Sequence, residues 1–88
     1  PAAARAGVFR VQIASLRSED EARAAWERTR RAHSDLLGRM EPTIERVDLG
    51  ARGIYFRLQA GPLSEKTLAD MLCSQLKARN VGCIVVAL

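Results

Sequence analysis

The stretch Phe9-Arg10-Val11-Gln12-Ile13-Ala14-Ser15-Leu16 decides the fold, because its first part returns as Phe56-Arg57-Leu58-Gln59 in the second half of the chain. The spacing is repeated as well, since Leu16 follows Gln12 at the same interval at which Leu63 follows Gln59. Each copy leads directly into a stretch with helical periodicity. The duplication predicts two strand-then-helix units whose polar residues occupy equivalent positions on one sheet face.

Both copies alternate with the period of two that is typical of a strand with one buried face and one open face. On the buried side we expect Phe9, Val11 and Ile13 from residues 8–14, and Phe56, Leu58 and Ala60 from residues 54–60. On the open side we expect Arg10, Gln12 and Ala14 from the first strand, and Tyr55, Arg57 and Gln59 from the second.

Two helices follow these strands. Ser18 and Glu21 form a capping box in front of a helix predicted over residues 19–37. Its apolar stripe comprises Ala22, Ala25, Trp26, Thr29, His33, Leu36 and Leu37, at spacings of three and four. Ser64 is the expected N-cap of a second helix that reaches Arg79 and stacks Leu68, Leu72 and Leu76.

The remaining segments complete the order βαββαβ. A strand is expected at residues 43–49, where imperfect alternation indicates a bulge or an edge position. The other predicted segments are a linker tail at 1–7, a hairpin connection at 48–53 and a last strand at 83–88. This order predicts an α+β fold of the ferredoxin-like type, a four-stranded antiparallel sheet with two helices on one face. Right-handed crossovers give the strand order 4-1-3-2 and leave the other face open.

Composition limits the function classes. The 88 residues suffice for one domain, no stretch approaches the about 20 apolar residues of a membrane span, and residues 1–7 are expected to lead in from a longer protein. The net charge of +4 favours an anionic partner without identifying it. The carboxylates of residues 19–21 are explained by helix capping, so we expect no catalytic residues, no cofactor and no metal site. The two cysteines, Cys73 and Cys83, are compatible with a disulfide or with two buried thiols.

Several interpretations of the open face remain. Its polar side chains can simply face water, as on many one-sided antiparallel sheets. A basic βαββαβ domain also describes RNA-recognition modules, but these stack bases on exposed aromatic rings, and here Phe9 and Phe56 fall on the buried side. A protein-docking module is a third class, with an apolar patch around Ile84 and Val86.

The phrases Phe9-Arg10-Val11-Gln12-Ile13-Ala14-Ser15-Leu16 and Tyr55-Phe56-Arg57-Leu58-Gln59-Ala60-Gly61-Pro62-Leu63 resemble the two signature segments of the SPOR domain family. The resemblance covers about residues 8–88. Gln59 and Ala60 stand where family members more often carry a basic and a β-branched residue, and Ala14 stands where glycine is common.

This resemblance implies a non-catalytic domain that binds peptidoglycan, specifically septal glycan strands stripped of stem peptides. It implies Gln12, Ser15 and Arg57 as glycan contacts, flanked by Tyr55 and Ile84. Arg10 and Gln59, on the same face, are expected to belong to the glycan-binding site as well. The implied setting is the periplasmic end of a membrane-anchored bacterial division protein, in which this domain is a monomer that contacts neither membrane nor nucleic acid. In that oxidising compartment a Cys73–Cys83 disulfide is expected, with division proteins as partners of the rest of the chain.

Overall fold

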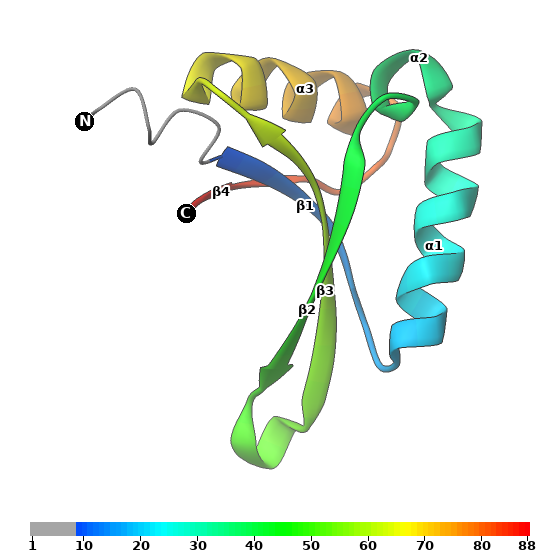
Figure 1. Ribbon diagram of the computed structural model, residues 1–88, viewed down its shortest axis with the longest axis vertical. Coiled ribbons are helices and arrows are strands. Elements are labelled where there is room, and N and C mark those ends of the chain that lie inside the picture. Colours follow the sequence, from blue (N-terminus) through cyan, green and yellow to red (C-terminus); the bar gives the residue numbers. More distant parts are fainter. Residues whose placement is uncertain (1–8) are drawn as a thin grey trace.

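The computed structural model describes residues 9–88 and has the predicted βαββαβ order (Figure 1). The expected tail at residues 1–7, and Val8 of the first strand, lie outside the described residues. The strands are β1 (Phe9–Leu16), β2 (Glu41–Asp48), β3 (Ile54–Leu63) and β4 (Ile84–Ala87). The helices are α1 (Glu19–Ala32), a short α2 (Ser34–Leu37), the 3-10 turn η2 (Gly50–Arg52) and α3 (Lys66–Ala78).

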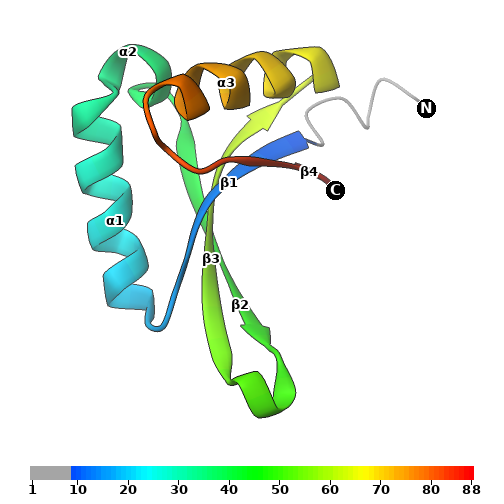
Figure 2. The same cartoon turned by 180° about the vertical axis from the view of Figure 1, so that it is seen from behind.

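The four strands form one antiparallel sheet in the order β2-β3-β1-β4, so the predicted strand order is confirmed. Helix α1 contacts β1, β2 and β3, while α3 contacts β1, β3 and β4. Both long helices therefore cover the same face of the sheet, and Figure 2 shows the arrangement from behind. The opposite face carries no helix within the described chain.

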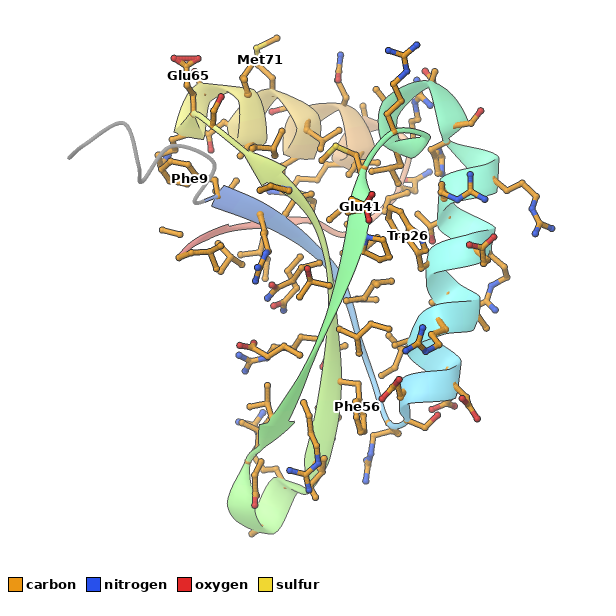
Figure 3. The ribbon with its side chains drawn as sticks, in the orientation of Figure 1. Phe9, Trp26, Glu41, Phe56, Glu65 and Met71 are labelled. Atoms are coloured by element: carbon orange, nitrogen blue, oxygen red, sulfur yellow. A yellow bond between two sulfur atoms is a disulfide. The ribbon has the colours of Figure 1, made fainter. Side chains whose placement is uncertain are left out.

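The core lies between this sheet face and the two helices. Val11, Leu58 and Ala60 from the central strands are fully buried there, together with Leu37 and Leu76 from the helices. Trp26 is also buried and points from α1 toward the sheet (Figure 3), as its place in the apolar stripe predicts. Leu68 is an exception, because it is 42% exposed and does not continue the Leu72–Leu76 stack into the core.

The first helix begins as predicted but ends early. Ser18 accepts a hydrogen bond from the backbone N–H of Glu21 at 3.1 Å, which confirms the N-cap. The predicted continuous helix over residues 19–37 is wrong, because His33 adopts φ −129° and ψ 46° and separates α1 from α2. Leu37 of α2 is nevertheless fully buried, so the apolar stripe predicted for one helix continues across the break.

The second long helix begins one residue later than expected. Glu65, and not Ser64, is the N-cap of α3, and its side chain makes no capping hydrogen bond. The helix ends at Ala78, followed by Asn80 with φ +64°. None of the helices between Phe9 and Leu88 is long and apolar enough to cross a membrane.

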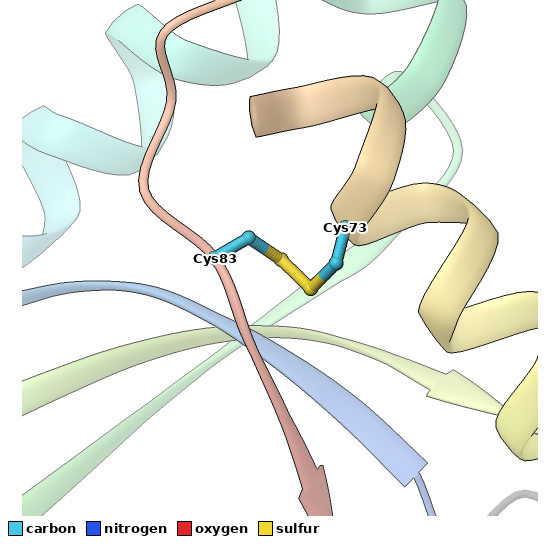
Figure 4. Close-up of a disulfide and its surroundings, with 2 residues drawn as sticks. All are labelled: Cys73 and Cys83. Atoms are coloured by element: carbon cyan, nitrogen blue, oxygen red, sulfur yellow. A yellow bond between two sulfur atoms is a disulfide. The ribbon is translucent and has the colours of Figure 1, made fainter. Parts of the chain in front are cut away.

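Cys73 of α3 and Cys83, one residue before β4, form a disulfide (Figure 4). Both residues are buried. The bond attaches the segment that enters β4 to helix α3. The disulfide that the family resemblance implied is therefore present, and the alternative of two buried thiols is not.

Replacing both cysteines with serine is expected to lower the free energy of unfolding by about 2–3 kcal/mol. The bond joins residues 10 apart in sequence, and a loop of that size constrains the unfolded chain by about this amount. Urea denaturation measures the change, and the wild type in reductant should match the double variant in oxidising buffer. A denaturation midpoint that reductant leaves unchanged would contradict the prediction.

A surface ion pair joins the α1–α2 break to the end of α3. Arg79 donates two hydrogen bonds to the Asp35 carboxylate, at 2.8 and 2.6 Å. These hydrogen bonds, together with the positive charge, lower the pKa of Asp35 from its ordinary 3.8 to about 2. The bidentate geometry is the arrangement in which an exposed pair contributes most to stability.

The Asp35–Arg79 pair predicts an acid-dependent loss of stability. Because the folded-state pKa of Asp35 lies below its unfolded-state value, the contribution is complete above about pH 4 and is lost as the pH falls through about 2. The Asp35→Asn variant should be less stable than the wild type at neutral pH, with the two converging near pH 2. Denaturant midpoints measured across this range test the prediction, and a constant difference between the proteins would contradict it.

Candidate functional site: the open sheet face

One extra residue in β1 determines which side chains reach the open face. Gln12 lies opposite Gln59, whereas Ala14 already lies opposite Leu58, so Ile13 is an added residue at a β-bulge. Without it, Gln12 and Ser15 would point to opposite sides, because they are three residues apart. With it, both belong to the open face, and Ser15 lies directly across from Arg57.

The bulge corrects one predicted orientation. Regular alternation placed Ala14 on the open face with Arg10 and Gln12. In the structure Ala14 pairs with the fully buried Leu58 and packs against the core, and Ile13 packs there too.

Two transverse rows of side chains lie at the centre of the open face, each defined by strand register. The first row runs Ile84, Gln12, Gln59 and Thr43 across β4, β1, β3 and β2. The second row runs Ser15, Arg57 and Glu45 across β1, β3 and β2. The structure therefore brings together the three central predicted contacts, Gln12, Ser15 and Arg57, on adjacent strands.

Gln59 is on the predicted face but is almost fully covered by its neighbours, because it is only 2% exposed. Its Nε2 donates to Gln12 Oε1 at 3.2 Å, and its Oε1 accepts from Arg10 Nη1 at 3.5 Å. This burial favours an indirect role, and the expectation that Gln59 contacts a glycan stays a prediction. Arg10, Gln59 and Gln12 form a hydrogen-bonded chain, here called the amide relay.

Arg57 has a different environment. Its cross-strand partners are Ser15 and Glu45, and its guanidinium forms no ion pair or side-chain hydrogen bond with any residue in the range 9–88. Its five N–H donors are therefore free to meet a ligand. Arg46, the neighbouring arginine on β2, lies opposite Phe56 and so belongs to the helix-covered side.

Tyr55 lies further along β3, and its ring is partly covered. The Arg17 guanidinium stands 4.7 Å from the ring centroid, and its Nη1 donates to Tyr55 Oη at 3.2 Å. The ring of Tyr55 thus has a cation–π partner on one face. Gly53 makes room for Arg17, since a Cβ at this position would lie 3.3 Å from Arg17 Nη2.

Among residues 9–88, Ile84 is the most exposed large apolar side chain, at 62%, and it borders a hollow beside the bulge. Pairing of β4 with β1 ends at Ile84 and Gln12, so residues 13–16 of β1 have no paired strand on that side within the described chain. The resulting hollow has a volume of about 310 Å³ and is lined by Gln12, Ile13, Ala14, Ser15, Gly82, Cys83 and Ile84. A larger hollow of about 380 Å³ lies between α3 and β4, away from Arg57 and Ser15.

Sequence reasoning missed four residues of this face. Thr43 and Glu45 enter it from β2, where Ile44 packs against the core and its two neighbours point outward. That alternation was the available signal. Arg17 and Gly82 lie outside the strands, and no periodicity indicated their positions. In the described part of the chain, no three His, Cys, Asp or Glu side chains gather into a set that could hold a metal ion.

Comparison with known proteins agrees with this geometry. Residues 6–87 match the SPOR domain, and the chain belongs to the SPOR domain family. Two similar solved structures are the peptidoglycan-binding domain of the B. subtilis cell wall lytic enzyme CwlC and the RlpA SPOR domain from Pseudomonas aeruginosa. No curated protein sequence gave a significant match.

The two structural matches support the fold. The CwlC domain is 22% identical with a TM-score of 0.59, covering 89% of this chain and 85% of its own. The RlpA domain is 16% identical with a TM-score of 0.63, covering 91% of this chain and 99% of its own. At these identities the similarity establishes the ferredoxin-like architecture of the SPOR fold.

Gly53→Ala is expected to lower the free energy of unfolding by about 1–3 kcal/mol. Gly53 has φ +100° and ψ −171°, a region that is almost exclusive to glycine. The new methyl group would also lie 3.3 Å from Arg17 Nη2, so this side chain must shift slightly beside Tyr55. Gly82→Ala is the matched control, because a Cβ there meets no atom within 4 Å, and its stability should be nearly unchanged. Equal effects of the two substitutions in urea denaturation would contradict this account.

Proposed function

We propose that this domain binds peptidoglycan without catalysis, through the open sheet face, and prefers glycan strands from which stem peptides have been removed. The observation that carries the proposal is the convergence of Gln12, Ser15 and Arg57 on a face that no described helix covers. Membership of the SPOR family and the likeness to the peptidoglycan-binding domain of CwlC support the ligand class.

The chemistry of the face suits a bare glycan. Such a strand offers hydroxyl and acetamido groups, which amide and hydroxyl side chains meet with hydrogen bonds. Removal of a stem peptide by an amidase converts the lactyl amide into a free carboxylate. Arg57, at the centre of the second row, has no ion-pair partner among residues 9–88. A carboxylate can accept two parallel N–H donors from its planar guanidinium.

The preference for stripped strands then has two physical causes. The free lactyl carboxylate adds a charge-assisted hydrogen bond to Arg57, and the absence of the peptide removes bulk that would block close approach to a shallow face. The hollow beside Ile84 can take an apolar group such as an acetamido methyl.

Binding of this kind would direct an attached protein to places where stripped strands accumulate. At a division septum, amidases produce such strands, so the domain would recruit the remainder of its protein there. The disulfide is consistent with this setting, because the cell envelope outside the inner membrane is oxidising. We propose that the domain acts there as a monomer, as the periplasmic end of a membrane-anchored protein.

Arg57→Ala is expected to weaken binding to amidase-treated sacculi by about tenfold or more, the usual effect of losing a hydrogen bond between charged groups. Arg46→Ala is the matched control, since it removes the same side chain from the helix-covered side of the adjacent strand and should leave binding unchanged. Quantitative pull-down with treated and untreated sacculi measures both effects.

Three results would contradict the proposal: binding that does not increase after amidase treatment, equal losses in the two arginine variants, or displacement of sacculi by single-stranded RNA. The last result would instead support an RNA-recognition function.

A further inference from the structure

The amide relay fixes the orientation of Gln12. We infer that Gln59 is a positioning residue, which holds the Gln12 side chain so that its NH₂ group, and not its carbonyl oxygen, faces the ligand. This inference rests on the proposed glycan-binding function and deepens it, because it makes Gln12 a hydrogen-bond donor that selects acceptor groups on the glycan.

The argument begins at Arg10. A guanidinium has only N–H donors, so the atom of Gln59 that faces Arg10 must be its carbonyl oxygen, Oε1. The planar amide of Gln59 then directs its Nε2 toward Gln12. Because an NH₂ group only donates, the atom of Gln12 that meets it must be Oε1, as the 3.2 Å contact shows. Each orientation follows from the one before it.

The burial of Gln59 makes a reversed orientation of the two amide groups unfavourable. Gln59 is 2% exposed, so water cannot readily replace a lost partner. A reversed amide would place the buried NH₂ group of Gln59 against the N–H donors of Arg10. Every buried side-chain polar atom among the described residues has a hydrogen-bond partner. Gln12 Nε2 has no partner among those residues, and it is therefore accessible at the surface.

The consequence for recognition is specific. Gln12 lies directly opposite Ile84 of β4 and borders the hollow beside the bulge. An NH₂ group at this position favours acetamido carbonyls and hydroxyl oxygens as partners.

The decisive variant is Gln59→Glu. Glutamate keeps the length of the side chain and the contact with Arg10, but its second oxygen also accepts. Gln12 must then turn its NH₂ inward to donate, and its carbonyl oxygen faces the ligand. We expect affinity for amidase-treated sacculi to fall about five- to tenfold, the loss of one hydrogen bond together with an unmatched acceptor.

Gln59→Met is the control for packing, because methionine has a similar length and imposes no orientation on Gln12. Its binding should lie between the wild type and Gln59→Glu. If Gln59 served only to fill space or to satisfy Arg10, glutamate would be tolerated at least as well as methionine. That order of affinities would overturn the inference.

A second measurement requires no glycan and reports orientation directly. In the free wild-type protein, NMR should show fast hydrogen exchange with water for the Gln12 side-chain NH₂ and slow exchange for that of Gln59. In Gln59→Glu the Gln12 NH₂ should become protected. Unchanged Gln12 exchange would refute the relay, even if binding falls through repulsion between the new carboxylate and a lactyl carboxylate. Conversely, a wild type that fails to bind sacculi would refute the proposed function, while the exchange rates still decide the orientation.

Discussion

The antiparallel pairing of β1 with β3, with one extra residue at Ile13, is the constraint on which the rest of this structure depends. Before the bulge, Val11 points into the core and Gln12 points outward. After it, Ala14 packs inward and Ser15 points outward. The extra residue, Ile13, packs against the core itself. Its insertion also aligns Gln12 and Ser15, which are three apart in sequence, on one surface. Core packing and the alignment of the open face both follow from the register shift at Ile13.

The topology could be predicted from the sequence because the pattern that indicates it occurs twice. Two copies of one strand pattern, each followed by a capped amphipathic segment, restrict the chain to very few arrangements. The site was harder, since it depends on details that period-two alternation does not record. The adjacent apolar pair Ile13–Ala14 was a visible break in alternation, and it marked the bulge. In contrast, the burial of Gln59 depends on Arg10 lying above it from the neighbouring strand, which no local pattern shows. Similarly, the stripe of the first helix continues past His33, so periodicity concealed the break there.

Net charge is a poor guide to the ligand of this domain. Several arginines are on α1, where Arg23 pairs with Glu19 and both Arg30 and Arg31 pair with Glu27. The opposite charges in these exposed ion pairs offset one another, and solvent screens what remains, so the pairs attract a distant ligand only weakly. On the open face, Arg57 lies across from Glu45, so that surface is polar and not uniformly basic. The cation–π contact of Arg17 also occupies one face of the Tyr55 ring, which leaves no pair of open rings on which nucleic-acid bases could stack. What distinguishes this face chemically is therefore the placement of its individual donors and acceptors.

That placement is made rigid before any ligand arrives. Gly82 and Cys83 form one wall of the hollow beside the bulge, and the disulfide joins that wall to α3. The opposite wall is β1, which is held by β3 along most of its length. The amide relay adds a third restraint, because Gln12 is held by a buried partner and cannot rotate freely at the surface. Since ordering a flexible side chain on binding costs about 0.5–1.5 kcal/mol, a face with its donors already oriented retains more of the free energy of each hydrogen bond. A shallow surface with few contacts can select a repetitive polymer only under this condition, because no enclosing pocket compensates for donors that are out of place.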